Sequence, residues 1–237
     1  MGDPRAGPVR VWARGLVVLV PLLAAGLACG QSSPTAVGNV VVPTLITLPP
    51  VWTPTWDGKP SPVPGWILFP GNGVELWLPP TYEGGDPVAR TQELIDLIAA
   101  VPGYEDLAEV LQEDPGAYRL LAVDTAGGSV IGVTLKDVPA DMPMNNYVES
   151  WVAAVLRQTP GASLVEKGIV QFREQDTGRV ILEFAVQDET SWQLSYVVRR
   201  EAQVWTFNFA AIQGDFYQTQ PVFEQSMQSM QFLPTDE

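Results

Sequence analysis

Few side chains in this chain of 237 residues are suited to covalent or acid–base chemistry. Cys29 is the only cysteine, and there is no histidine. The lack of histidine excludes Ser–His and Cys–His nucleophilic pairs and ordinary zinc sites. A single cysteine cannot form an internal disulfide. The residues around Cys29 therefore bear most directly on the chemistry that this chain undergoes.

Cys29 ends a segment with the features of an export signal. The segment begins with Arg5, Arg10 and Arg14 and continues with an apolar run of 14 residues from Gly15 to Ala28. A permanent membrane span needs roughly 20 apolar residues, so the shorter run favours a secretory signal. The sequence thus predicts that residues 1–28 are a signal peptide.

The four residues Gly26-Leu27-Ala28-Cys29 resemble the lipobox of bacterial lipoproteins. The resemblance implies that Cys29 is the lipid attachment site: a diacylglyceryl group joins its sulfur, the peptide bond before it is cut, and the new amine is usually acylated. The expected product is an exported protein anchored to the outer face of the cell membrane, or to an outer membrane if one exists. The alternatives are an ordinary secretory signal and an uncleaved anchor.

The part of the chain that remains after cleavage is strongly acidic. Loss of three arginines and Asp3 moves the formal net charge from −14 to −16. Nucleic-acid phosphates and anionic lipid headgroups would both repel such a surface, so we expect no nucleic-acid partner and membrane contact only through the lipid anchor. The charge suits solubility in an exposed compartment, or contact with a cation or a basic partner.

Composition divides the exported chain into a tether, one domain and a short tail. Residues 29–64 contain the lipidated cysteine and a run rich in Pro, Thr and Ser, which favours an extended spacer. Residues 65–234 are long enough to bury a core without disulfides or metals. Residues 235–237 form the tail.

Hydrophobic periodicity and turn residues predict two hairpins, a four-stranded antiparallel meander and four helices, the last of which closes the domain. The expected strands are Trp66–Phe69, Val74–Leu78, Ala117–Asp124, Ser129–Val138, Leu164–Glu174, Val180–Gln187, Trp192–Arg200 and Val204–Ile212. The expected helices are Pro87–Val101 with Asp86 as its cap, Tyr104–Glu113, Asn145 or Asn146 to Gln158, and Phe216–Phe232. Two four-residue turns, at 125–128 and 175–178, are expected within this series.

This order of elements resembles the Mog1/PsbP-like domain, including PsbP-like and DUF1795-type envelope proteins. The likeness is carried by the opening segment Phe69–Pro79, by Ser195–Arg200 with Val204–Phe209, and by the closing segment Phe223–Met230. It implies an α+β fold: an α/β/α sandwich whose central antiparallel sheet is flanked by helices, with a closing C-terminal helix. The roles of relatives imply binding or assembly, although fold alone is a weak guide to function.

Two acidic patterns are candidates for catalysis or metal binding. Asp176-Thr177-Gly178 matches the tripeptide of aspartic proteases, but its polar neighbours favour a hairpin turn. Glu105, Glu109 and Glu113 follow one another at helical spacing and are weak candidates for a hard cation such as calcium. Because this segment lacks the pattern of a calcium loop, a solvated acidic face is the main expectation.

The sequence therefore favours a non-enzymatic binding or assembly module of an envelope complex, with a protein partner and no cofactor. We expect no catalytic residues, and the sequence identifies no binding residues. A lipoprotein that binds a small apolar ligand is the first alternative. An envelope enzyme that uses carboxylates, with or without a metal, is the second, and it would require two acidic side chains converging in a cleft.

Overall fold

The computed structural model describes residues 62–100, 104–186 and 189–233. Its strands are β1 (Ile67–Pro70), β2 (Val74–Leu78), β3 (Tyr82–Gly85), β4 (Leu120–Asp124), β5 (Val130–Asp137), β6 (Ala162–Phe172), β7 (Gln175–Val186), β8 (Glu189–Arg200), β9 (Gln203–Ile212) and β10 (Gln231–Phe232). Its helices are α2 (Thr91–Ala99), α3 (Glu105–Glu113), the 3₁₀ turn η1 (Pro115–Ala117), α4 (Met144–Gln158) and α5 (Gln213–Ser229).

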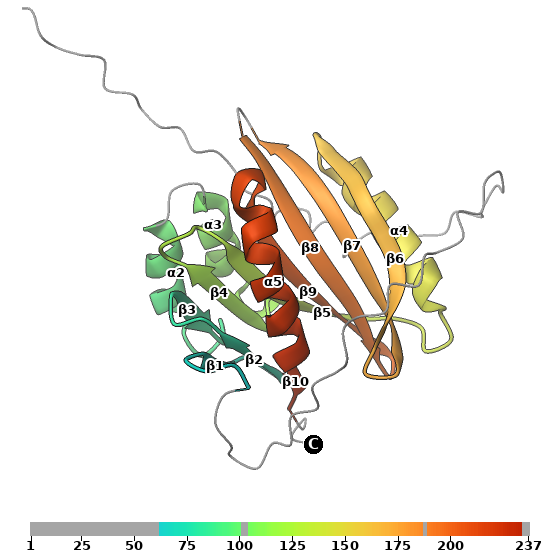
Figure 1. Cartoon of the computed structure of the whole chain (residues 1–237), viewed down its shortest axis with the longest axis horizontal. Helices are drawn as coiled ribbons and strands as arrows, with labels where there is room; N and C mark the ends of the chain where they lie inside the picture. Colours follow the sequence, from blue (N-terminus) through green and yellow to red (C-terminus); the bar gives the residue numbers. More distant parts are fainter. Residues whose placement is uncertain (1–61, 101–103, 187–188, 234–237) are drawn as a thin grey trace, which may run out of the picture.

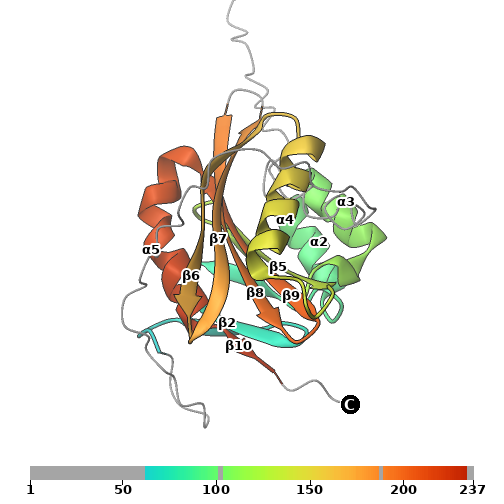
Figure 2. The same ribbon diagram turned by 90° about the vertical axis from the view of Figure 1, so that its right-hand side faces the viewer.

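The main sheet has seven strands in the order β3-β4-β5-β9-β8-β7-β6, and every neighbouring pair is antiparallel. Helix α5 covers one face, and α2, α3 and α4 cover the other (Figures 1 and 2). A smaller sheet, β1-β2-β10, lies at one end on the α5 side. The predicted α+β sandwich, with a central antiparallel sheet between helices and a closing helix, is confirmed.

The helices on both faces pack through the side chains that their spacing predicts. On α4, Tyr147, Trp151, Ala154 and Val155 recur on one face of the helix and are all buried. On the opposite side of the sheet, Phe223 and Met227 of α5 and the following Met230 are at most 1% exposed. These two apolar stripes hold the sheet between the helices.

The two faces of the sheet have differently organised cores. Under α5, a single apolar cluster joins β2 to strands β4 through β9. The opposite face has two separate clusters, one between α4 and strands β7, β8 and β9, and another between α2–α3 and strands β4 and β5. The helical pair α2–α3 therefore has its own core.

The largest difference from the predicted elements is the β6–β7 turn. The expected turn at 175–178 is wrong, because Thr177 pairs with Val170 and Gly178 with Ile169 inside the hairpin. The chain reverses instead at Arg173 and Glu174, whose φ angles are 51° and 63°. Two positive φ angles suit the twist of a two-residue hairpin. Arg173 stabilises this turn by donating to the carbonyl of Gln228 at 2.8 Å.

Smaller differences have local causes. Helix α2 begins at Thr91 rather than Pro87, because Asp86 accepts a hydrogen bond from the N–H of Val88 in a separate preceding turn. Strands β3 and β10 were not expected, since Gly84 and Gly85 are poor strand formers and Gln231–Phe232 is only two residues long.

Several sequence predictions lie outside the described residues. These are the signal peptide (1–28), Cys29, nearly all of the tether (29–64) and the tail (235–237). All described helices and strands fall within the predicted domain at 65–234. Among the described segments, no helix is both long and apolar enough to cross a membrane.

Candidate functional site

The acidic residues proposed for a cation lie on α3. Glu109 and Glu113 are exposed, and the side chain of Glu105 is outside the described set. Among the residues that the structure describes, no group of three His, Cys, Asp or Glu side chains is placed to hold a metal ion. The three glutamates therefore stay a prediction, and the described pair has the exposure of a solvated helix face.

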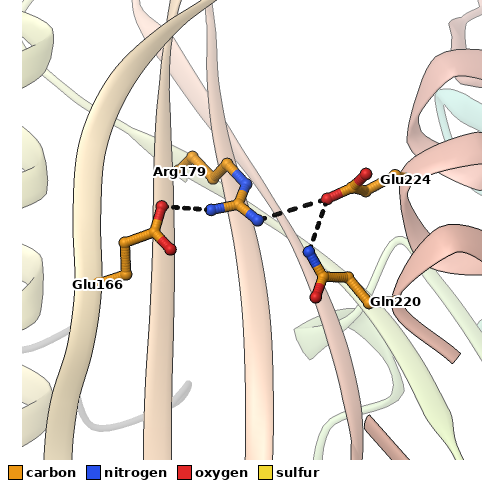
Figure 3. A network of polar contacts seen from close by, with 4 residues as sticks. All are labelled: Glu166, Arg179, Gln220 and Glu224. Carbon is orange, nitrogen blue, oxygen red and sulfur yellow. Dashed lines mark hydrogen bonds and ion pairs between the residues drawn. The ribbon is translucent and has the colours of Figure 1, made fainter. Parts of the chain in front are cut away.

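A network of charged and polar side chains lies between α5 and the β6–β7 hairpin (Figure 3). Arg179 of β7 donates through Nη1 to Oε1 of Glu166 on β6 at 2.6 Å. Its Nη2 lies 3.4 Å from Oε1 of Glu224 on α5. Gln220, one helical turn earlier, donates to the same Glu224 oxygen at 2.9 Å. One guanidinium therefore links two strands and a helix.

Strand register explains why these side chains meet. From the β6–β7 turn to Glu166 the pairing is regular, so Glu166 pairs with Ile181 and shares the α5 face with Arg179. The register shifts only beyond it, between Glu166 and Leu164, at a β-bulge. Hairpin register therefore places Glu166 and Arg179 on the same face.

The environment keeps the guanidinium charged. The side chain of Arg179 is 7% exposed, while those of Glu166 and Glu224 are 41% and 29% exposed. Burial opposes the charge, but Tyr196 and the two carboxylates outweigh it, and the pKa of Arg179 is raised. Burial is also the main reason that the pKa of Tyr196 rises to about 12. Neither side chain changes its charge near neutral pH.

An aromatic group adjoins this network at the N-terminal end of α5. Tyr217 is 65% exposed, and its ring lies 5.3 Å from that of Trp192 and 5.9 Å from that of Phe216, measured between centroids. Trp192 is buried and donates from Nε1 to Glu183 Oε2 at 3.0 Å. The exposed tyrosine is thus supported by two buried rings.

Both groups belong to one surface, which we call the α5–β7 site. Tyr217, Gln220 and Glu224 recur at i, i+3 and i+7, which places them on one side of α5. Arg179 and Glu183 are four residues apart on β7 and therefore share a sheet face. The full set is Glu166, Arg179, Glu183, Trp192, Tyr217, Gln220 and Glu224.

The side chains of this site are suited to non-covalent contacts. Three carboxylates outnumber one guanidinium, and an exposed aromatic ring lies beside them. The guanidinium bridges Glu166 and Glu224, so these carboxylates do not face each other across a reacting centre. The arrangement suits a partner that brings positive charge and apolar contact.

Sequence reasoning did not find the α5–β7 site. Arg179 followed the misplaced turn, so the hairpin register that pairs Glu166 with Ile181 was not predicted. The alternation of Arg179, Ile181 and Glu183 does place them on one face, as strand periodicity requires. Their meeting with α5, about 40 residues later, depends on tertiary packing.

No protein-family model matches this chain, and no curated protein matches it. Among solved structures, it is similar to the cyanobacterial PsbP protein (CyanoP) of Synechocystis sp. PCC 6803. That match has a TM-score of 0.52 and 12% identity, and it covers 75% of this chain and 99% of CyanoP. The chain has a Mog1/PsbP-like fold.

Two other solved structures are similar to this chain at lower TM-scores. LpqN, described as involved in cell envelope biogenesis of Mycobacterium tuberculosis, gives a TM-score of 0.42 and 11% identity over 71% of this chain and 91% of LpqN. The protein Mog1 gives 0.43 and 10% identity over 69% of this chain and 92% of Mog1.

Proposed function

We propose that this protein is a lipid-tethered, extracytoplasmic binding or assembly module of an envelope complex, and that the α5–β7 site is its contact surface. The observation that carries the proposal is the exposed ring of Tyr217, held against buried Trp192 beside a surplus of carboxylates. Tyrosine and tryptophan are enriched among the residues that dominate binding energy at protein interfaces. A rigidly supported ring also loses little conformational freedom on binding.

The partner is a protein segment that carries lysine or arginine near an apolar side chain. Glu166, Glu183 and Glu224 contribute negative charge against the single positive charge of Arg179, and the whole chain is strongly acidic. Complementary charge speeds encounter and selects against acidic competitors. The aromatic ring would supply the apolar contact, together with attraction to a cation over its face.

Non-enzymatic action is supported by the residues available. The chain has no histidine, and Cys29 is assigned to the lipid anchor. Glu166 and Glu224 each form an ion pair with one permanently charged guanidinium, that of Arg179. Extracytoplasmic location and tethering are supported by the arginine-led apolar run that ends at Cys29.

Site-specific crosslinking tests the contact surface. A photoreactive phenylalanine analogue replaces Tyr217 in one sample and Val88 in a matched control, in native membranes. Val88 is also well exposed, at 54%, but lies before α2. We expect one defined adduct from position 217 and none from position 88.

Binding to the partner identified in this way is then measured with purified proteins. Tyr217→Ala should weaken the affinity by about tenfold or more, and added salt should weaken it further. Val88→Ala should leave it unchanged. Equal crosslinking from both positions, or equal affinity of the two alanine variants, would reject the α5–β7 site as the contact surface.

A further inference from the structure

Strand β6 forms one outer edge of the seven-stranded sheet. In Figure 1 it lies at the margin of the sheet away from β3, with α4 beside it. Its 11 residues pair with β7 along one side, and no described strand pairs with the other side. Alternate residues of an antiparallel strand direct their N–H and C=O groups to opposite sides. Strand β6 therefore presents a row of backbone donors and acceptors at the outer edge of the sheet.

The other edges of the two sheets offer less backbone. Strand β3, at the opposite end of the main sheet, has 4 residues, and Arg90 donates a hydrogen bond to the carbonyl of Gly84 within it. In the small sheet, β1 has 4 residues and ends at Pro70, which lacks an N–H, and β10 has 2. Among the described residues, β6 is therefore the longest edge to which another strand could be added.

The β6 edge has a regular part and an irregular part. From Phe172 back to Glu166 the pairing with β7 is uninterrupted, and it shifts only between Glu166 and Leu164. Bulges and edge lysines are common devices against unspecific strand pairing. Here the bulge lies beyond the regular part, and Lys167 is paired with Glu149 of α4. Neither feature prevents a strand from pairing along the regular part.

Apolar side chains are exposed near the start of β6, on the side of α4. Leu164 and Val165 are 37% and 44% exposed. Leu156 of α4, at 36%, follows Glu149 by two helical turns and therefore lies on the same side of the helix. Because Glu149 reaches Lys167 and the chain reverses between α4 and β6, Leu156 lies near the first residues of β6. An exposed apolar group thus adjoins the free edge.

The α5 side of the same edge is acidic. Glu166 lies on the outermost strand and is 41% exposed, and Glu183 of β7 pairs with the small residue Ser163. Arg179 bonds to one oxygen of Glu166, and a carboxylate has sites for further donors. A residue on an added strand directly opposite Glu166 would have its Cβ about 5 Å from that of Glu166. Lysine or arginine is favoured at that position, and an acidic residue is disfavoured.

We infer that an extended segment of the partner protein pairs with β6 as an additional strand, with lysine or arginine on the α5 side and apolar residues on the α4 side. Side chains of a strand alternate between its two faces, so the segment alternates basic and apolar residues. Strand addition takes its affinity from backbone hydrogen bonds and its specificity from alternate side chains. The inference rests on the proposed protein contact and gives the conformation of the bound segment, since Glu166 belongs to both surfaces.

The test uses the full-length protein labelled with nitrogen-15 and a capped peptide that alternates lysine and valine and matches residues 166–172 in length. The backbone amide signals of these residues are followed during the titration. We expect saturable shifts, corresponding to a Kd of about 1 mM or tighter. A peptide in which glutamate replaces each lysine should bind more weakly, because its charges would face Glu166.

N-methylated peptides test whether the contact is strand pairing. Two versions of the lysine–valine peptide carry N-methyl groups on one or the other alternate set of residues. In a paired strand one set of N–H groups faces β6 and the other faces solvent. Methylation should therefore abolish binding in one version and spare it in the other.

A substitution at the edge tests the contact from the side of the protein. Val165→Lys places a positive charge beside the bound segment and should weaken the affinity for the lysine–valine peptide by about tenfold. Val88→Lys is the matched control, because it makes the same charge change at an exposed valine before α2. It should change the affinity little. If Val165→Lys does not fold, the methylated peptides still decide, since they leave the protein unaltered.

Hydrogen exchange in the free protein tests whether the edge is open. The outward amides among residues 166–172 should exchange rapidly and become protected when the lysine–valine peptide binds. Protection without the peptide would mean that a second copy or another segment of this chain covers the edge, and would overturn the inference.

Three further results would also overturn it: no saturable shifts, equal binding of the two methylated peptides, or equal affinity of the two lysine variants. Failure of the proposed contact is read separately, from crosslinking at position 217. A defined adduct there with no pairing at β6 would overturn the strand-pairing inference alone.

Discussion

Gly178 of β7 lies directly against Val148 of α4. A Cβ atom added to Gly178 would overlap Cγ2 of Val148 and would also press against Val197 of β8. The missing side chain therefore allows α4 to approach the sheet closely. This approach buries the apolar face of α4, including Val148 itself at 1% exposure.

We expect Gly178→Ala to lower the free energy of unfolding by about 1–3 kcal/mol, because the added methyl group overpacks the contact with Val148. Gly168→Ala is the matched control on the adjoining strand β6, where a Cβ would meet nothing within 4 Å. That change should be neutral or stabilise by about 0.5 kcal/mol, since alanine loses less conformational freedom than glycine. Urea unfolding measures both, and equal effects would contradict the close-packing explanation.

The same glycine shows where sequence reasoning succeeds and where it fails. Asp176-Thr177-Gly178 has residues typical of a turn, but strand pairing continues through all three. The real turn uses Arg173 and Glu174, neither of which is a usual residue for positive φ. Contacts of Arg173 with Gln228 and with the Phe172 ring favour that turn, and these depend on the packed α5 and on the hairpin itself.

Long periodic elements were predictable because their apolar spacing is repeated several times. Two helices show this. Tyr147 and Trp151 of α4 and Phe223 of α5 recur at helical spacing and are all buried. The four-strand meander was predicted in the right order. The α5–β7 site was not predictable, because Arg179 and Glu224 are 45 residues apart and meet only after the helix packs on the sheet.

Replacing Arg179 by methionine should destabilise the domain by about 1–3 kcal/mol, because the charge-assisted bonds to Glu166 and Glu224 are lost. The two carboxylates are partly exposed and can regain water, which limits the loss. A double-mutant cycle with Glu166→Gln should show stronger coupling than one with Glu224→Gln, since the distances are 2.6 Å and 3.4 Å.

Lys167→Met is the control for this cycle. Lys167 pairs with Glu149 on the other face of β6, and both side chains are substantially exposed. Its removal should change the free energy of unfolding by about 1 kcal/mol at most. If Arg179→Met costs no more than Lys167→Met, the Arg179 network does not hold α5 to the hairpin.

Stability should fall in alkaline solution because several tyrosines are buried. Burial raises the pKa of Tyr82, Tyr104 and Tyr118 above the ordinary value, and that of Tyr196 to about 12. The unfolded chain loses its tyrosine protons near pH 10, before the folded chain does. The free energy of unfolding is therefore intact below about pH 10 and decreases between about pH 10 and pH 12.

Urea unfolding over this range, combined with tyrosinate absorbance, measures the effect. Tyr196→Phe should make the decline shallower, because one group no longer ionises preferentially in the unfolded chain. A constant free energy of unfolding through this interval would contradict the assigned burial of these hydroxyls.

Calcium should not stabilise the domain through α3. Glu109 and Glu113 are exposed, so their carboxylates keep their water and offer no enclosed oxygen cage. A site with a Kd tenfold below the added calcium concentration would contribute about 1.4 kcal/mol and raise the Tm by about 3–6 °C. Thermal unfolding with calcium and with a chelator checks this, and a saturable rise lost in Glu109→Gln would establish a cation site.

The mass of the mature N-terminal peptide distinguishes the three interpretations of the export signal. If Cys29 is lipidated, the mature protein begins at Cys29, carries a diacylglyceryl group and an amide-linked acyl chain, and partitions into a detergent phase. Several acyl chains give stable anchoring, whereas one gives marginal binding. Cys29→Ser should abolish both the lipid mass and the detergent partitioning. An unmodified mature N-terminus would indicate an ordinary secretory signal, and a chain that keeps residues 1–28 would indicate an uncleaved anchor.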